Sequence, residues 1–356
     1  MSESFAMLLN DDGICLNVWS IGDLNIDGRV VLGPMSGYTT ASYRAFMKPF
    51  GVGLSFTEMI SDTGVIHGVG RTLGYMRFTG NHPTGMQLFG HDPDRLALAA
   101  ERALVMNPEV DLIDINMSCP VRKVTRNGSG SVLMRDPELC GRIIRAVKAA
   151  VDVPVTAKIR LGWTLKDANY RDVLDELESA EVDAVSFHPR AQSEHYAGCP
   201  HYDEVEGIRG RISVPLIISG NIYSLGDAVY ALEKTGADAV MVARGGIGNP
   251  MLIKQIDTYL RTGETVPNPT VSQQTAWCRQ LTDMMIEEKG HDLTIRNMRS
   301  IAPKFIAGCH SCRDYRRRLA EEPDSRESLF SLLDEIDSRM GDQTVHADGR
   351  IPMSDL

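Results

Sequence analysis

The sequence predicts an α/β fold, a (β/α)8 TIM barrel followed by an all-helical C-terminal domain. Apolar runs of strand length occur eight times, separated by segments of helix length. They extend over roughly 230 residues, which is the size of such a barrel. Beyond about residue 259 the helical pattern continues without a strand candidate. An open doubly wound sheet is the structural alternative, but no G-x-G-x-x-G motif follows the first strand to support it.

The strand candidates are short apolar stretches that end in polar residues or glycine. They span residues 30–32, 54–57, 85–88, 112–116, 155–159, 184–187, 216–219 and 239–242. Ahead of them, residues 21–32 alternate around Asp27 and Gly28. This pattern predicts a hairpin that turns at Asp27 and Gly28 and leads into the first barrel strand.

Helix start signals divide the rest of the chain. Residues 93–106 open on proline, 136–150 on an acidic cap followed by proline, and 224–235 on a serine cap. Further helices are predicted at 271–289, 293–307 and 325–339. The predicted organisation is an N-terminal extension (1–18), a barrel domain (19–260), a helical domain (270–340) and a polar, mobile tail (341–356).

Composition and charge narrow the class of protein. The 356 residues are 43% hydrophobic, with no run long enough to span a membrane and no secretory signal. Seven scattered cysteines predict reduced thiols and a cytoplasmic location. For the oligomeric state, we favour a monomer. The net charge of −10 disfavours a nucleic-acid partner. Two basic clusters, 122–126 and 313–318, could still contact a nucleic acid. The second is also explained as a solvated helix face.

Polar residues at the predicted strand ends outline one site, because the carboxyl ends of barrel strands meet at one face. They include Gln87, Cys119, Lys158 and His188. Cys119 follows the buried run 112–116 and precedes a basic, glycine-rich stretch. Lys158 is costly to bury, so an anionic or electron-rich ring beside it would explain its place.

The last two strand ends predict a phosphate site. Residues 219–221 and 243–250 are rich in glycine, a helix follows, and Arg244 adds a fixed cation. The alternative is that these glycines only form tight turns between strand and helix.

Cys309 and Cys312 have the spacing of half a metal site, with His291 as a possible contributor. A structural zinc needs four ligands, and no second pair is visible, so we predict no metal.

Seven motifs, in order, carry a resemblance to a known family. They are 33–39 (GPMSGYT), 57–59 (TEM), 87–90 (QLFG), 114–120 (DINMSCP), 158–163 (KIRLGW), 188–190 (HPR) and 236–245 (GADAVMVARG). Together they resemble the tRNA-dihydrouridine synthases, flavin-dependent barrel enzymes with a helical C-terminal domain. The chain departs from the family pattern at Ser118, where glycine is usual, at residues 219–221, and around residues 299–301 in the helical domain.

The resemblance implies FMN as the cofactor, tRNA as the partner and Cys119 as the catalytic residue. The implied reductant is NAD(P)H, and within the family it is NADPH. The resemblance places around the FMN Pro34, Met35, Ser36, Gln87, Lys158, His188, Ser219, Gly220, Asn221, Ala243 and Arg244. Substrate contacts are expected from Asn116 and Arg160, which would hold the uracil edge and a nearby phosphate, and from Arg122, Lys123 and Arg126, which would guide the backbone.

The implied reaction is the reduction of uridine to 5,6-dihydrouridine. Reduced flavin supplies a hydride to one carbon, and Cys119, as a neutral thiol, supplies a proton to its neighbour. The target base must leave its stack to enter the barrel mouth. One alternative is an FMN-dependent barrel oxidoreductase acting on a free small molecule, a pyrimidine or an enone, which the acidic total charge favours. Another is an RNA-binding or scaffold protein without turnover, which the presence of Cys119, Lys158 and Arg244 disfavours.

Overall fold

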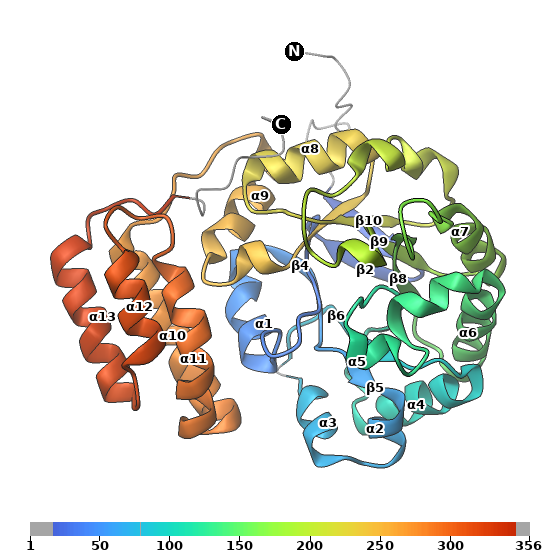
Figure 1. Ribbon diagram of the computed structural model, residues 1–356, viewed down its shortest axis with the longest axis horizontal. Coiled ribbons are helices and arrows are strands. Elements are labelled where there is room, and N and C mark those ends of the chain that lie inside the picture. The colour runs from blue at the N-terminus through green and yellow to red at the C-terminus, as the bar shows by residue number, and fades with distance from the viewer. Residues whose placement is uncertain (1–16, 79, 347–356) are drawn as a thin grey trace.

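Eight parallel strands form a closed barrel (Figure 1). The structure is a computed structural model and describes residues 17–78 and 80–346. The barrel strands are β3 (Val30–Leu32), β4 (Val52–Phe56), β6 (Thr84–Phe89), β7 (Leu112–Asn116), β8 (Val155–Gly162), β9 (Ala184–Ala191), β10 (Leu216–Ser219) and β11 (Ala239–Val242). The ring closes where β11 pairs with β3 and β4 pairs with β6. The predicted TIM barrel is confirmed.

Most of the strands lie where the apolar runs predict them, but β8 and β9 extend further. They end at Gly162 and Ala191, because Arg160, His188 and Arg190 continue the strands as buried polar residues. A short strand, β5 (Ile60–Ser61), pairs with the C-terminal end of β6, at Leu88 and Phe89. The extension of β8 and β9 carries their polar side chains to the end of the barrel that holds the site.

A two-stranded antiparallel sheet covers the amino-terminal end of the barrel. Strands β1 (Val18–Ile21) and β2 (Leu24–Asp27) form a hairpin whose turn is at Gly22 and Asp23, not at the predicted Asp27 and Gly28. Gly28, with φ 97°, instead leads from β2 into β3. Ile21 and Ile26 of the hairpin pack on the inward side chains of the barrel. Burying each such side chain contributes roughly 1.5–3 kcal/mol.

Helices surround the barrel and follow the strands. They are α1 (Ala41–Met47), α2 (Asp62–Ile66), α3 (Gly70–Tyr75), α4 (Pro93–Met106), α5 (Arg122–Thr125), α6 (Pro137–Ala150), α7 (Tyr170–Ser179), α8 (Leu225–Thr235) and α9 (Pro250–Thr262). The predicted caps Asp136 and Ser224 are present, and Asp92 caps α4 in the same way: each side chain accepts a hydrogen bond from the first turn of the helix that follows.

Four helices follow the barrel and pack together, and α10 among them lies against α1 (Figure 1). They are α10 (Val271–Lys289), α11 (His291–Phe305), α12 (Arg313–Glu321) and α13 (Arg326–Met340), of which α12 has no counterpart among the predicted helices. Glu288, near the end of α10, accepts hydrogen bonds from the amides of Ala41 and Ser42 at 3.1 and 3.0 Å. Glu288 therefore provides an acceptor for N–H groups in the first turn of α1, which lie too early in the helix to be satisfied within it.

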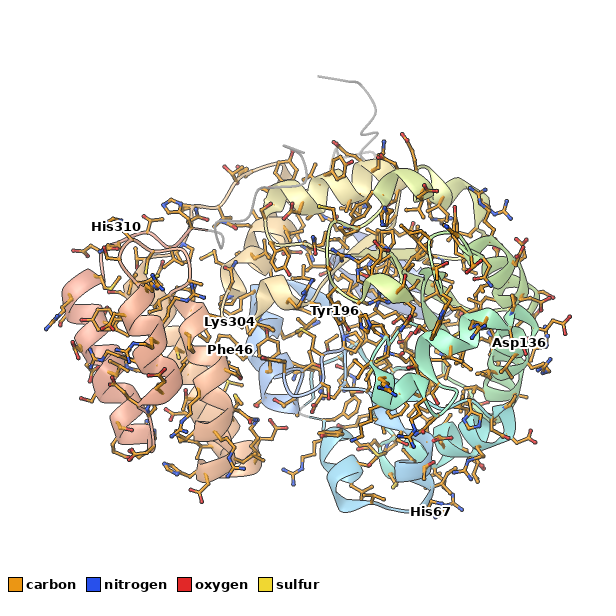
Figure 2. The ribbon with its side chains drawn as sticks, in the orientation of Figure 1. Phe46, His67, Asp136, Tyr196, Lys304 and His310 are labelled. Atoms are coloured by element: carbon orange, nitrogen blue, oxygen red, sulfur yellow. The ribbon has the colours of Figure 1, made fainter. Side chains whose placement is uncertain are left out.

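An aromatic contact between α1 and α11 also joins the C-terminal helices to the barrel domain. The rings of Phe46 and Phe305 meet edge to face with their centroids 6.4 Å apart. Figure 2 labels Phe46 near this boundary between the barrel and the C-terminal helices.

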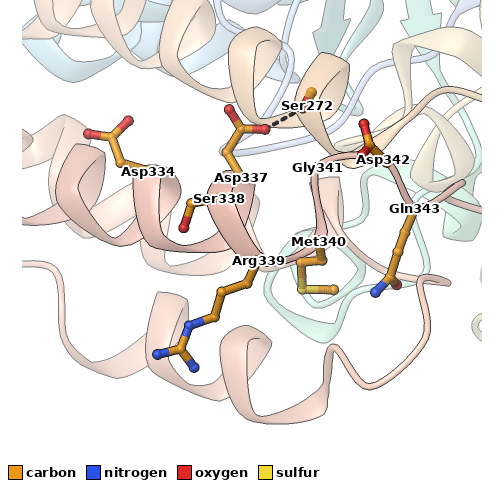
Figure 3. A pocket seen from close by; sticks show the side chains of 9 residues that line it. All are labelled: Ser272, Asp334, Asp337, Ser338, Arg339, Met340, Gly341, Asp342 and Gln343. Atoms are coloured by element: carbon orange, nitrogen blue, oxygen red, sulfur yellow. Dashed lines mark hydrogen bonds between the residues drawn. The ribbon is translucent and has the colours of Figure 1, made fainter.

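The described part of the tail, Gly341 to His346, is held against the start of α10. Val345 N–H donates to the Pro269 carbonyl at 2.8 Å, and Thr344 forms a bridge with Thr270. Figure 3 shows a pocket here between α10 and α13, where Ser272 donates to Asp337. The rest of the predicted tail, 347–356, and the predicted extension up to residue 16 lie outside the described residues, and Val18 belongs to β1. No helix in the described ranges has the length and apolar content needed to cross a bilayer.

Candidate active site

A pocket of about 350 Å³ opens at the carboxyl ends of the barrel strands. Loops after six of the strands contribute to its wall, and Tyr196 lies in the middle of this face in Figure 2. The predicted residues that line it are Pro34, Met35, Ser36, Asn116, Cys119, Lys158, Arg160, His188, Ser219, Gly220, Asn221, Ala243 and Arg244. The structure thus brings together segments that are up to 210 residues apart in sequence, from Pro34 to Arg244.

The wall of the pocket is cationic, although the chain carries a net charge of −10. Burial, together with the positive charges of Arg160, Lys158, Arg190 and Arg244, holds the pKa of His188 well below its ordinary value, so the imidazole is neutral. Its Nε2 accepts a hydrogen bond from Arg190 at 2.9 Å. A concentration of positive charge around a neutral ring favours an anionic ligand.

Lys158 provides the test of fit for a flavin. Only 9% of the residue is exposed, and burial, with a further contribution from Arg160, lowers its pKa to about 8. No residue in the described part of the chain accepts a hydrogen bond from its ammonium group. An anionic or electron-rich ring beside this ammonium group would offset the cost of burying it, so a flavin ring fits this part of the pocket.

Cys119 lies on the turn after β7 and is 6% exposed. Its N–H donates to Asn116 Oδ1 at 2.9 Å, and its carbonyl accepts from the Ser131 hydroxyl at 3.0 Å. Burial raises the pKa of the Cys119 thiol, and the opposing effect of Arg160 and Lys158 does not cancel this. The thiol is therefore protonated at neutral pH and can act as an acid.

The segment after Cys119 is ordered by its own short helices rather than being a flexible turn. Helix α5 is followed by the 3₁₀ helix η2 (Gly130–Arg135). Gly130 has φ 67°, and a Cβ at this position would lie 2.8 Å from the Cys119 carbonyl oxygen. Glycine is thus required where the chain passes close to the thiol turn.

Gln87, which is predicted to lie at the FMN, is absent from the residues that line the pocket. It is fully buried one layer down in the barrel, where Nε2 donates to Asp114 at 2.6 Å and Oε1 accepts from Asn116 at 2.8 Å. Both ends of its amide are occupied within the protein. The sequence shows that Gln87 lies at the end of an apolar run. It does not show that the side chain lies one layer below the pocket inside the barrel.

Arg160 lines the pocket, but its donors hold the surrounding loops. Its Nε donates to the Ser118 carbonyl at 2.7 Å, and Nη1 donates to the carbonyls of Ala191 and His195 at 3.1 and 2.9 Å. It therefore ties the turn bearing Cys119 to the loop after β9. These contacts position the loops around the pocket, and the role of Arg160 at the substrate stays a prediction.

The loops after β10 and β11 form the other side of the pocket. Gly220 has φ 127°, and a Cβ there would lie 2.9 Å from Pro200 and 3.1 Å from His188. Asn221 Oδ1 accepts from Arg190 at 3.1 Å and from Arg244 at 3.4 Å. Arg244 is exposed at the rim, at the start of the 3₁₀ helix η6 (Arg244–Gly246). The arrangement leaves a cation and a small-residue wall at the place predicted for a phosphate.

Tyr196 is a site residue that the sequence reasoning missed. Its ring lies 5.3 Å from the Arg160 guanidinium and 5.1 Å from that of Arg244, and it stacks on His188 at 6.5 Å. Tyr38 and Tyr223 also line the pocket. The available signal was an aromatic residue in the unusually long connection after β9, close to Gly198.

The two predicted basic clusters differ in the structure. Arg122, Lys123 and Arg126 are exposed on and just after α5, beside the pocket. Arg317 pairs with Asp314 and Glu321, whereas Arg318 pairs with Glu322 and with Glu335 of α13. Two arginines of the cluster on α12, Arg317 and Arg318, are thus paired with carboxylates.

Cys309 and Cys312 are buried close together, and burial raises the pKa of Cys309 to about 12. The ring of His291 instead accepts a hydrogen bond from the Arg326 amide. Within the ranges that the structure describes, no group of three or more His, Cys, Asp or Glu side chains is placed to hold a metal ion.

The fold and the site define a TIM-barrel enzyme whose pocket, at the carboxyl ends of the strands, combines a protonated thiol with a cationic wall. The chain belongs to the dihydrouridine synthase family, since the model "Dihydrouridine synthase (Dus)" matches residues 31–340. This membership confirms the family resemblance and implies a flavin cofactor.

Individual relatives agree with this assignment. A probable tRNA-dihydrouridine synthase 1 of Synechocystis is 35% identical over 76% of this chain and 76% of its own length. The tRNA-dihydrouridine synthase B of Pseudomonas aeruginosa is 32% identical over 89% of this chain and 95% of its own length. Among solved structures, histamine dehydrogenase from Rhizobium matches with a TM-score of 0.54 at 15% identity, covering 96% of this chain and 67% of that one, which shows a shared fold.

Proposed function

We propose that this protein is a tRNA-dihydrouridine synthase that reduces uridine in tRNA to 5,6-dihydrouridine with FMN as its cofactor. The observation that carries the proposal is the protonated thiol of Cys119 in the same pocket as a cationic wall. Reduction of the uracil double bond requires a hydride at one carbon and a proton at the next, and the hydride is what FMN supplies when bound and reduced.

The residues that line the pocket suit FMN. The ammonium of Lys158 would stabilise negative charge on the reduced ring, and Arg244 with the neighbouring glycine backbone would hold the phosphate. The small residues Ser219, Gly220 and Ala243 let a flat ring approach the backbone. Neutral His188 completes this side without adding another charge.

Cys119 serves as the proton donor. Its raised pKa keeps the proton on sulfur until the neighbouring carbon accepts it, and the thiolate formed is then stabilised by Arg160 and Lys158. Arg160 and Asn116 hold the turn on which the thiol lies. We assign them this positioning role in addition to facing the substrate.

The uridine would enter as a flipped base, since the pocket lies within the barrel mouth. The exposed cations of α5 suit the tRNA backbone on its way there. NADPH is the proposed reductant. We further propose a cytoplasmic monomer with an RNA-binding helical domain at 270–340.

Mass spectrometry of tRNA nucleosides from a strain lacking the protein tests the proposal. We expect dihydrouridine to be lost at one or more tRNA positions, and to return with the wild-type gene but not with Cys119→Ala. Unchanged dihydrouridine in every tRNA would contradict the proposal and favour the reductase of a free pyrimidine or enone.

Substitution of Arg244 by alanine should weaken FMN binding by about ten- to a hundredfold, the value of a charge-assisted hydrogen bond to phosphate. Fluorescence titration of the deflavinated protein with FMN measures this. The control is Arg142→Ala, because Arg142 lies on the outer face of α6 and is about half exposed. Equal affinity in wild type and Arg244→Ala would remove the phosphate assignment.

Replacing Arg122, Lys123 and Arg126 together by alanine should weaken tRNA binding and flatten its dependence on salt. Each lost phosphate contact lowers the slope of log K against log salt by about 0.7–0.9. The control is the double variant Arg317→Ala and Arg318→Ala, whose cations are already paired with carboxylates. A loss confined to the control variant would place the RNA on α12 instead.

A further inference from the structure

A row of polar side chains crosses the inside of the barrel beneath the pocket. Gln87, Asp114 and Thr156 are register partners on the neighbouring strands β6, β7 and β8, and all three are fully buried. Asn116 lies two residues beyond Asp114 on β7, so its side chain points to the same face, one layer closer to the pocket.

These side chains form a continuous chain of hydrogen bonds. Asp114 Oδ1 accepts from Thr156 at 2.7 Å, and Oδ2 accepts from Gln87 Nε2 at 2.6 Å. Gln87 Oε1 then accepts from Asn116 Nδ2 at 2.8 Å. The other end of that amide, Asn116 Oδ1, accepts from the backbone N–H of Cys119 at 2.9 Å and of Ser118 at 3.2 Å.

The carboxylate decides the direction of the whole chain. An ionised Asp accepts hydrogen bonds but donates none, so Gln87 must turn its NH₂ group toward Asp114 and its carbonyl toward Asn116. Asn116 must then donate with its NH₂ group and present its carbonyl oxygen to the turn of Cys119. Without the acceptor at Asp114, the NH₂ group of Gln87 loses its partner, and only the backbone N–H groups of Ser118 and Cys119 still favour this orientation of Asn116. The turn is then held less firmly.

Asp114 is costly in this position, which argues for a use. Burial raises its pKa to about 6, even though the hydrogen bonds from Gln87 and Thr156 and the charge of Lys158 act in the opposite direction. At neutral pH it is therefore mostly ionised inside the barrel. Apolar replacements of buried charged groups are often neutral or stabilising, so stability alone does not explain this residue.

We propose that Asp114 is a positioning residue for Cys119, holding the thiol turn through the oriented amides of Gln87 and Asn116. The proposal rests on the proposed function for the role of the thiol as proton donor. It assigns control of that thiol to a carboxylate that is separated from it by two side chains and lies outside the pocket wall.

The test measures how accessible and how fixed the thiol is. The protein as purified is treated with iodoacetamide, and mass spectrometry follows the alkylation of Cys119 with the exposed Cys199 as internal reference. Asp114→Ala should raise the relative alkylation rate by about tenfold, which corresponds to the loss of one hydrogen bond. It should also increase amide hydrogen exchange in residues 116–121 and lower the rate of uridine reduction.

Two further variants separate positioning from general damage. Asp114→Asn should stay within about twofold of wild type, because its amide oxygen still accepts from Gln87. Thr156→Val removes the other hydrogen bond of the carboxylate, on the side away from Cys119, and should leave the alkylation rate unchanged. If Asp114→Asn behaves like Asp114→Ala, the argument from amide direction is wrong.

Should Asp114→Ala not fold, Gln87→Leu interrupts the next link with the carboxylate in place, and the same rise in alkylation is expected. A wild-type rate in whichever of these two variants folds overturns the inference. Because alkylation does not depend on the substrate that is reduced, the two proposals fail separately. If the variants alkylate Cys119 at the wild-type rate while the deletion strain lacks dihydrouridine, only the role of Asp114 is refuted. If the variants alkylate Cys119 faster while the deletion strain keeps its dihydrouridine, only the proposed function is refuted.

Discussion

Cys119→Ala should retain bound FMN and lose uridine reduction by about 10²- to 10⁴-fold, the usual contribution of a positioned general acid. The thiol is 6% exposed, and the turn around it is held through backbone groups, so removing the sulfur should leave the pocket intact. Single-turnover oxidation of the reduced enzyme by tRNA measures the loss, and the flavin absorption spectrum verifies that the cofactor is bound.

The dependence of this step on pH has a definite sign. The acid is active while the thiol is protonated, and burial raises the pKa of Cys119. The wild-type rate should therefore stay level through neutral pH and fall only as the pH rises through that raised pKa. Cys199→Ala is the matched control, because Cys199 is an exposed free thiol outside the pocket lining. Wild-type turnover in Cys119→Ala would end the assignment of the proton donor.

Lys158→Met should weaken FMN binding and abolish its dependence on alkaline pH. Burial lowers the pKa of Lys158 to about 8 in the protein without a ligand, and an anionic ligand beside it raises that pKa. Binding therefore takes up a proton, and wild-type affinity should fall as the pH rises above about 8, by at most about tenfold per pH unit. In Lys158→Met the affinity should be low and should lack this fall.

Titration of the deflavinated protein with FMN at several pH values gives both quantities. Lys148→Met is a suitable control, since Lys148 is paired with Asp183 at 2.8 Å, outside the pocket lining. Parallel pH profiles for wild type and Lys158→Met would show that another group carries the linkage. Reduction potentials add an independent measure, because loss of the ammonium should make the bound flavin harder to reduce.

The sequence predicts the barrel well, because its strands are apolar runs bounded by clear breaks. Strands β7 and β10 coincide with their predicted ranges. The prediction stops too early at β8 and β9, where the chain alternates buried cations with apolar residues. It also misplaces the hairpin turn, because Asp27 and Gly28 do make a turn, but one between two different sheets.

For the site, strand order is sufficient to bring the predicted residues together, because closure of a barrel gathers all the strand ends. Depth and partners are not visible in the same way. Gln87 lies a layer below the pocket, and the acceptors of Arg160 belong to backbone in distant loops. Arg318 is neutralised by Glu335, which is on another helix. Such pairings depend on tertiary packing, which residue types and spacing along the chain do not specify.

The cap that Glu288 places on α1 limits how the enzyme can be dissected or recombined. A fragment ending at the linker would leave the first amides of α1 without their acceptor and would expose Phe46 to water. Such a fragment is not a minimal form of the enzyme. A chimera carrying another relative's C-terminal helices would need a carboxylate at the same place. The contact between the two parts therefore restricts which C-terminal domains can be exchanged.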